Sequence, residues 1–239
     1  MSLLGRVARG LHPGLRAVHA QVARYAAEWE SANGVALGGA GPLWVVLGDS
    51  TAQGIGAPSW EEGYVGQLLR ALNDGAERPW RVLNLSRSGA RAADVVDRQL
   101  PALEAMGRDA DLVTCAIGAN DVVRRTPGPV LEGQLRAIMS RLPERAIIAT
   151  VPQGLNSART EAANRLIRAE APPTRLVVAD VWAHTGPPWH GKLAADGFHP
   201  GVLGYADWAA AFAEVLDQAL PPRFPEPGRP PHHLGSGES

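Results

Sequence analysis

Residues that could form one nucleophilic site are spread over three short segments of this chain. Gly48-Asp49-Ser50 follows one apolar run, Gly118-Ala119-Asn120-Asp121 follows a second, and Asp196-Gly197-Phe198-His199 lies near the C-terminal end. A serine hydroxyl is a weak nucleophile until a neighbouring base takes its proton. The first and third segments supply a hydroxyl and an imidazole, and the second supplies an amide that can stabilise negative charge.

Ser50 is the candidate nucleophile and His199 its candidate general base. Asp196 lies three residues before His199, so one turn of the chain can place its carboxylate against Nδ1 and leave Nε2 free to face Ser50. Each of these signals is weak by itself. A serine after a strand is often a helix N-cap or a turn residue, and Asp196 could simply cap a turn before Pro200.

Asn120 and Gly89 are candidate donors to a negatively charged oxygen. An Asn side chain aimed at developing charge stabilises it by roughly 3 kcal/mol. Gly89 lets a ligand approach its backbone N–H because glycine has no Cβ. The structural alternatives are that Asn120 or Asp121 caps the following helix and that Gly89 is an ordinary turn residue.

The apolar runs of the chain predict strands that are covered on both faces, because none alternates strictly between apolar and polar residues. These runs are residues 43–47, 81–85, 112–117, 146–151 and 176–181. Between and after them, apolar residues recur at helical spacing. The helical patterns lie around residues 64–72, 92–103, 131–142, 162–167 and 202–216.

Strands that alternate with helices predict an α/β fold, a three-layer α/β/α sandwich with a five-stranded parallel sheet. In such sheets functional residues gather at the carboxyl ends of the strands. Ser50, Gly89 and Asn120 each follow a predicted strand, and His199 follows the fifth strand after a long loop. The predicted fold therefore brings the candidate residues to one edge of the sheet.

The four blocks together resemble the SGNH hydrolases, the GDSL-type lipase and esterase family. That family has Gly-Asp-Ser in its first block, a Gly after strand two, Gly-x-Asn-Asp after strand three and Asp-x-x-His near the end, and all four blocks are present between about residues 43 and 220. The resemblance implies a flavodoxin-like sheet. It also implies these roles: Ser50 as nucleophile, His199 as base oriented by Asp196, and an oxyanion hole of the Ser50 and Gly89 backbone amides with the Asn120 side chain.

Two positions depart from the family pattern without removing a catalytic group. Thr51 stands where the GDSL motif has Leu, and Ser86 stands where the second block often has another Gly. The chain has no Gly-x-Ser-x-Gly around Ser50, which argues against the nucleophile elbow of the α/β-hydrolases.

The resemblance implies hydrolysis of a carboxylic ester through an acyl-enzyme on Ser50. The partner is then a small-molecule ester, with acyl-lipids included, and lysophospholipase or thioesterase activity is an alternative with the same triad. Acyl transfer to a bound alcohol and a non-enzymatic binding module on the same fold also stay open. Nothing in the sequence calls for a metal or an organic cofactor, and nothing in it indicates an oligomeric state.

Four loops are expected to shape the substrate pocket, namely residues 52–60, 122–129, 152–159 and 183–195. Their tryptophans could form apolar walls or belong to the core; they are Trp60, Trp182 and Trp189. Arg124 and Arg125 follow the oxyanion turn and could meet an anionic headgroup, although solvated helix residues are the simpler interpretation.

Composition indicates a globular protein with room for a full core. The chain has 239 residues, 45% of them hydrophobic and 20% charged. Its formal net charge of −1 gives no electrostatic footprint for nucleic acid. The single cysteine, Cys115, cannot form an internal disulfide and is expected to be a small buried hydrophobe.

The chain is expected to have three parts: an N-terminal helical extension and linker (residues 1–42), an SGNH-type domain (43–220) and a disordered Pro-rich tail (221–239). Helical spacing covers about residues 14–31, and the Gly-rich residues 33–42 are interpreted as a linker. The helix is expected on the flank of the domain, with a membrane-surface role as the alternative. No secretory signal or membrane span is expected, so a cytoplasmic location is the default.

Overall fold

Five short apolar strands form a parallel sheet in the computed structural model, which describes residues 13–107, 109–155 and 157–220. The strands are β1 (Leu43–Gly48), β2 (Arg81–Asn84), β3 (Leu112–Ala116), β4 (Ile147–Ala149) and β5 (Val177–Ala179). Their order is β2-β1-β3-β4-β5, and every neighbouring pair is parallel. The predicted five-stranded parallel sheet is therefore confirmed, each strand lying within its predicted apolar run or extending one residue beyond it.

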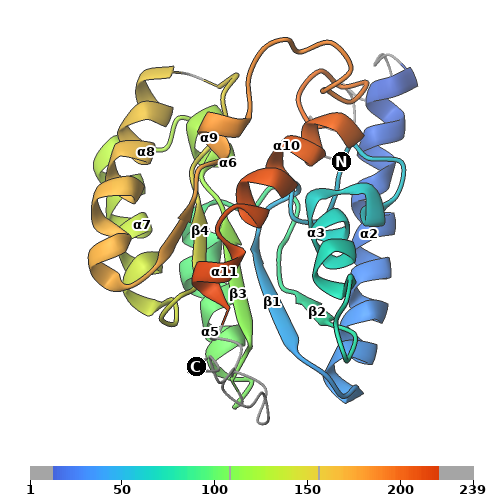
Figure 1. Cartoon of the computed structure of the whole chain (residues 1–239). Helices are drawn as coiled ribbons and strands as arrows, with labels where there is room; N and C mark the ends of the chain where they lie inside the picture. Colours follow the sequence, from blue (N-terminus) through green and yellow to red (C-terminus); the bar gives the residue numbers. More distant parts are fainter. Residues whose placement is uncertain (1–12, 108, 156, 221–239) are drawn as a thin grey trace, which may run out of the picture.

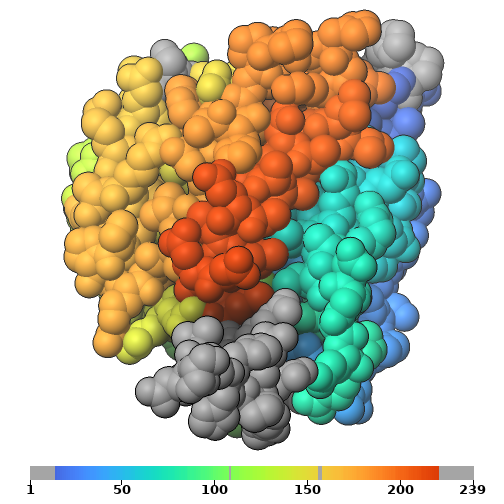
Figure 2. Space-filling view, viewed as in Figure 1, coloured from blue at the N-terminus to red at the C-terminus, as the bar shows by residue number. Residues whose placement is uncertain are grey.

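Helices cover both faces of this sheet, as Figure 1 shows. One face packs against α2 (Pro13–Gly38), α3 (Tyr64–Asn73), α10 (Val202–Ala213) and α11 (Leu216–Ala219). The other face packs against α4 (Ala92–Asp94), the π-helical turn η3 (Val95–Gln99), α5 (Leu100–Glu104), α7 (Gly128–Arg141) and α8 (Ser157–Glu170). In Figure 2, α10 and α11 form a band between α3 and α8. The three-layer sandwich is confirmed.

The central strand β1 shows how the sequence divides the core into two halves. Side chains of a strand point alternately to opposite faces. Trp44 and Val46 therefore contact the layer that contains α2 and α3, whereas Val45 and Leu47 contact the layer that contains α7 and α8. All six residues of β1 are buried, which explains why the strand is apolar without alternation.

Four further short helical elements occur among residues 13–220 that the structure describes. They are η2 (Trp60–Glu62), α6 (Ala119–Val123), η4 (Pro172–Thr174) and α9 (Val181–His184). Of these, α6 follows β3 directly and carries Asn120, so its start lies at the carboxyl edge of the sheet.

Helix α2 is longer than the sequence pattern predicts. It includes Asn33 and continues to Gly38, so the interpretation of residues 33–42 as a linker was wrong except for the last four. Tertiary contacts stabilise the additional turn. The Asn33 side chain accepts from the backbone N–H of Asn84 and donates to its carbonyl, at 2.7 and 2.8 Å, and Arg81 donates to the carbonyl of Ala36.

The same helix lies on the flank of the domain, as predicted, and supports the segment that follows Ser50. Tyr25 donates from its hydroxyl to the carbonyl of Ala57 at 2.8 Å, and the Trp29 indole N–H donates to the carbonyl of Gln53 at 3.2 Å.

The predictions for residues 1–12 and for the tail 221–239 lie outside the described residues. Within the part of the chain that the structure describes, no helix is long and apolar enough to cross a membrane.

Candidate active site

The end of β1 holds the backbone before Ser50 in a conformation that only glycine fits. A Cβ on Gly48 would lie 2.5 Å from the carbonyl oxygen of Ala116 on the neighbouring strand. The Gln99 side chain donates to the Gly48 carbonyl and accepts from its N–H, both at 2.8 Å. These contacts fix the path of the chain into the turn that presents Ser50.

Asp49 forms a buried polar link beneath this turn. Its side chain accepts from the Thr51 backbone N–H at 2.9 Å and from the Thr51 hydroxyl at 2.8 Å. The other carboxylate oxygen accepts from Asn120 Nδ2 at 3.3 Å. Burial raises the pKa of Asp49, while the two hydrogen bonds from Thr51 act in the opposite direction. The turn of β1 and the segment after β3 are thereby joined.

Ser50, His199 and Asp196 lie in one hydrogen-bonded line. Ser50 Oγ is 3.0 Å from His199 Nε2, and His199 Nδ1 is 2.6 Å from Asp196 Oδ2. The Asp196 Oδ1 atom accepts from the backbone N–H groups of Phe198 and His199, each at 3.0 Å. Burial alone would raise the pKa of Asp196, but the hydrogen bonds from His199 and the two N–H groups hold it below its ordinary value. Asp196 is therefore a carboxylate at neutral pH.

The loop that carries His199 folds back on itself and packs on the segment after Ser50. The backbone N–H of Ala194 donates to the His199 carbonyl at 2.8 Å, and that of Gly201 donates to the Lys192 carbonyl at 2.8 Å. Gly56 permits the close approach of this loop, because a Cβ there would lie 2.8 Å from His199 Cβ. The imidazole thus reaches Ser50 although 149 positions separate the two residues.

The three candidate oxyanion donors follow three adjacent strands. Asn120 Nδ2 donates to the Ala90 carbonyl at 3.0 Å in addition to its longer contact with Asp49. Gly89 has φ +77°, a left-handed conformation that favours glycine. Among the described residues, neither the Ser50 nor the Gly89 backbone N–H has a hydrogen-bond acceptor. Both groups are available to a ligand.

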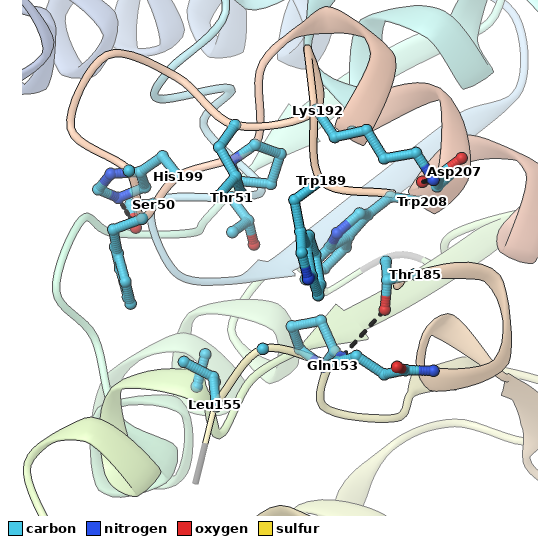
Figure 3. Close-up of a pocket in the computed structure, with 18 of the residues that line it drawn as sticks. Ser50, Thr51, Gln153, Leu155, Thr185, Trp189, Lys192, His199, Asp207 and Trp208 are labelled. Atoms are coloured by element: carbon cyan, nitrogen blue, oxygen red, sulfur yellow. Dashed lines mark hydrogen bonds and ion pairs between the residues drawn. The ribbon is translucent and has the colours of Figure 1, made fainter. Parts of the chain in front are cut away.

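A cavity of about 250 Å³ opens beside Ser50 and His199. Its walls include the indole rings of Trp189 and Trp208, and Lys192 and Asp207 line it as an ion pair with 2.8 Å between Nζ and Oδ2. Figure 3 shows Ser50 and His199 on one side of the view, the ion pair on the other and the two indoles between them. The cavity is a mainly apolar space with a charged pair in its lining.

Two of the four predicted pocket loops contribute to this cavity. Residues 152–155 and several of residues 183–195 line it, among them Trp189 as predicted. The loops 52–60 and 122–129 do not, and Trp60 packs on Trp29 with ring centroids 4.3 Å apart. Trp182 also lies outside the lining. The prediction that residues 52–60 line the cavity was wrong, because the packing of Trp60 on Trp29 of α2 takes this loop away from it. Residues 122–129 lie outside the lining of this cavity.

Sequence reasoning missed several residues that support the site. Gln99 and Asp49 hold the turn of Ser50, and Trp208, Lys192 and Asp207 line the cavity. Trp208 and Asp207 belong to α10, where the apolar spacing indicates only a core helix. No local signal in the sequence distinguishes these side chains from ordinary helix residues.

Cys115 and the possible metal ligands of the described residues are not arranged for chemistry. Cys115 is fully buried in β3, and burial raises the pKa of its thiol to about 12, so it is no thiolate nucleophile at neutral pH. Within the described ranges, no three His, Cys, Asp or Glu side chains are grouped so that they could hold a metal ion.

The fold and the site point to one family. This chain belongs to the GDSL-like Lipase/Acylhydrolase family, whose model matches residues 46–206. It is therefore a hydrolase of the GDSL type, and the SGNH resemblance of its motifs is confirmed. No curated protein sequence matches it significantly.

Solved structures of other proteins share the fold of this chain. TesA superposes with a TM-score of 0.63 at 24% identity, covering 74% of this chain and 99% of TesA. The lipase/acylhydrolase from Enterococcus faecalis gives 0.58 at 22% identity, covering 77% and 99%. Axe2, an acetylxylan esterase from Geobacillus stearothermophilus, gives 0.58 at 24% identity, also covering 77% and 99%.

Proposed function

We propose that this protein hydrolyses carboxylic esters through an acyl-enzyme on Ser50. The observation that carries the proposal is the line from Ser50 Oγ to His199 Nε2 at 3.0 Å and from His199 Nδ1 to Asp196 Oδ2 at 2.6 Å. A base within hydrogen-bond reach of a hydroxyl, itself oriented by a carboxylate, is the arrangement that activates a serine.

In the first half of the reaction, His199 Nε2 takes the Ser50 proton while Oγ bonds to the ester carbonyl carbon. The carbonyl oxygen becomes an oxyanion, which the backbone N–H groups of Ser50 and Gly89 and the side chain of Asn120 stabilise. Asp196 stabilises the imidazolium. The bond to the leaving alcohol then breaks, and the alcohol oxygen takes the proton from His199.

In the second half, water replaces the alcohol. His199 removes a proton from the water as its oxygen attacks the acyl-enzyme, and a second oxyanion forms at the same donors. Its collapse releases the carboxylic acid and returns the proton to Ser50 Oγ. The Asn120 N–H that faces Asp49 at 3.3 Å is the donor that turns to the oxyanion, because the contact with Ala90 is the shorter one.

The cavity favours a short acyl group. Its volume of about 250 Å³ lies below the range of roughly 300–1,000 Å³ that is typical of pockets for drug-sized ligands. Trp189 and Trp208 offer the apolar walls that an acyl chain requires. We therefore expect butyryl and hexanoyl esters to be better substrates than esters of long fatty acids.

The experiment is hydrolysis of p-nitrophenyl esters by the wild-type protein and by Ser50→Ala and His199→Ala. Each substitution should lower kcat by a factor on the order of 10⁴ to 10⁶, and the double variant should lose little more, because the two groups act as a unit. Ser140→Ala, which changes an exposed serine on α7, is the matched control and should keep wild-type activity. Normal turnover by folded Ser50→Ala would overturn the proposal.

A further inference from the structure

Four arginines lie close along the chain to the candidate oxyanion residues Gly89 and Asn120. Arg87 and Arg91 stand two residues before and after it, and Arg124 and Arg125 follow α6, which carries Asn120. All four are exposed. Within the part of the chain that the structure describes, no carboxylate forms an ion pair with any of them. We call these four residues the arginine rim.

Arg124 lies directly against Gly89. Its Nη2 atom is 3.2 Å from the position that a Cβ on Gly89 would occupy. Because standard bond lengths put the nitrogen and Cβ of one residue about 2.5 Å apart, this guanidinium is within about 6 Å of the Gly89 nitrogen. The Gly89 backbone N–H, which is available to a ligand, and the Arg124 guanidinium are therefore neighbours.

Two carboxylates near the arginine rim, Asp94 and Asp121, have other hydrogen-bond partners. Asp94 accepts from the backbone N–H of Arg91 at 2.9 Å and forms no ion pair with another described residue. Asp121 is buried and accepts from the Ala92 backbone N–H and the Thr126 hydroxyl. The four guanidinium groups therefore have no ion pair with a described carboxylate that would compete with an anionic ligand, although the net charge of the whole chain is −1.

We propose that the arginine rim selects esters whose alcohol part bears a phosphate group. The inference rests on the proposed function, because it needs a scissile ester at Ser50. In this proposal the acyl group occupies the cavity, and the alcohol part lies outside its lining, which contains neither Gly89 nor Arg124. Guanidinium groups bind phosphate oxygens in bidentate pairs, and a phosphate monoester, close to two negative charges at neutral pH, suits several cations better than a carboxylate does.

The test compares two butyryl esters that differ only in the phosphate, 1-butyrylglycerol 3-phosphate and 1-butyrylglycerol. The wild-type protein should show a kcat/KM ratio of about three to ten in favour of the phosphorylated ester at low salt. The ratio should fall towards one in Arg124→Gln, stay intermediate in Arg124→Lys and decrease as salt is added.

Arg78→Gln is the matched control. Arg78 is an exposed arginine that precedes β2, so it lies at the opposite end of the parallel sheet from Ser50. The substitution removes the same charge from the protein, and the substrate ratio should not change. A ratio of one in the wild-type protein, or an equal loss in Arg78→Gln and Arg124→Gln, would overturn the arginine rim as a specificity site.

A binding measurement separates this inference from the proposed function. Calorimetry with glycerol 3-phosphate should give weaker binding to Arg124→Gln than to the wild-type protein, and glycerol should bind to neither. If the wild-type protein hydrolyses 1-butyrylglycerol but shows no phosphate preference and no such binding, the arginine rim fails and the esterase stands. If no ester is hydrolysed, the proposed esterase function is wrong. In that case the arginine rim is supported as a phosphate site only if glycerol 3-phosphate binds and the binding depends on Arg124.

An anionic membrane surface is the competing occupant. Sedimentation with phosphatidylglycerol vesicles that depends on Arg124, without binding of glycerol 3-phosphate, would contradict the selection of a phosphorylated alcohol.

Discussion

The side-chain amide of Asn120 lies 3.3 Å from the carboxylate of Asp49, so a buried acid connects the proposed oxyanion segment to the turn of the proposed nucleophile Ser50. The amide is also anchored at 3.0 Å to the Ala90 carbonyl. Both contacts come from elements at the carboxyl ends of adjacent strands, so the amide is held beside Ser50 before any substrate binds. In the proposed reaction the oxyanion replaces only the longer contact, the one with Asp49.

Asn120→Ala should lower kcat by a factor on the order of 10² to 10³ with little change in KM. The reason is that the lost N–H stabilises charge that develops only in the transition state. Steady-state kinetics on p-nitrophenyl butyrate measures the effect, and a thermal melt shows whether the variant is folded. A folded variant that keeps kcat within threefold of the wild-type value would remove Asn120 from the oxyanion hole.

Asp49→Asn should make stability less dependent on pH. Burial raises the pKa of Asp49 in the folded state, so its contribution to stability is present below the unfolded value of about 3.9 and is lost as pH rises through the folded pKa. The Asn oxygen can still accept from Thr51. The unfolding free energy of Asp49→Asn relative to the wild-type protein should therefore increase between about pH 4 and pH 7. Urea unfolding at several pH values measures it, and a constant difference would contradict the buried-acid account.

Asp196→Asn should lower kcat by a factor on the order of 10⁴, because an amide cannot stabilise the His199 imidazolium. Its pH dependence has the opposite sign to that of Asp49. The folded pKa of Asp196 is depressed, so the carboxylate contributes stability above the unfolded value of about 3.9, and this contribution is lost as pH falls through the folded pKa. The stability gap between the wild-type protein and Asp196→Asn should therefore narrow in acid.

Asp180→Asn is the matched control for this variant. Although burial alone would raise the pKa of the Asp180 carboxyl, hydrogen bonds from Arg168 and Thr150 hold this pKa below its ordinary value. The difference in stability between the wild-type protein and Asp180→Asn should also become smaller in acid, while kcat should stay at the wild-type value. Equal loss of activity in Asp180→Asn and Asp196→Asn would show that the effect comes from destabilisation rather than from the contact with His199.

Trp189→Ala should shift the preferred acyl chain to longer lengths. The Trp189 ring lines the cavity and packs over Gly154, where a Cβ would lie 3.2 Å from the indole, so its removal enlarges the space for an acyl group. Trp182→Ala, in the same region but outside the lining, should keep the wild-type profile. A panel of p-nitrophenyl esters from acetate to decanoate measures the preferred acyl length of both variants. An unchanged preference in Trp189→Ala would contradict binding of the acyl group in this cavity.

The sheet and the position of the site could be predicted from sequence because both depend on local patterns. Strands buried on both faces appear as apolar runs, and the loops at their carboxyl ends must share one edge of the sheet. Ser50, Gly89 and Asn120 were placed by this rule, and the structure puts all three at that edge, with His199 within 3.0 Å of Ser50.

The remaining features depend on contacts between distant parts of the chain. Gly34 costs a helix about 1 kcal/mol relative to Ala, so the sequence favours an end to α2 near Asn33. The hydrogen bonds of Asn33 to Asn84 extend the helix, and no local pattern reveals them. The cavity lining could not be predicted from sequence for the same reason, because Lys192 and Asp207 meet only when α10 packs against the loop that carries Lys192.

Covalent labelling tests the central claim most directly. A fluorophosphonate should modify the wild-type protein at one residue, and peptide mass spectrometry should place the phosphonyl group on Ser50. Preincubation with a butyryl ester should slow the labelling, and His199→Ala should react far more slowly because its serine has no base. A label on another residue, or a folded wild-type protein that takes up none while it hydrolyses esters, would contradict an acyl-enzyme at Ser50.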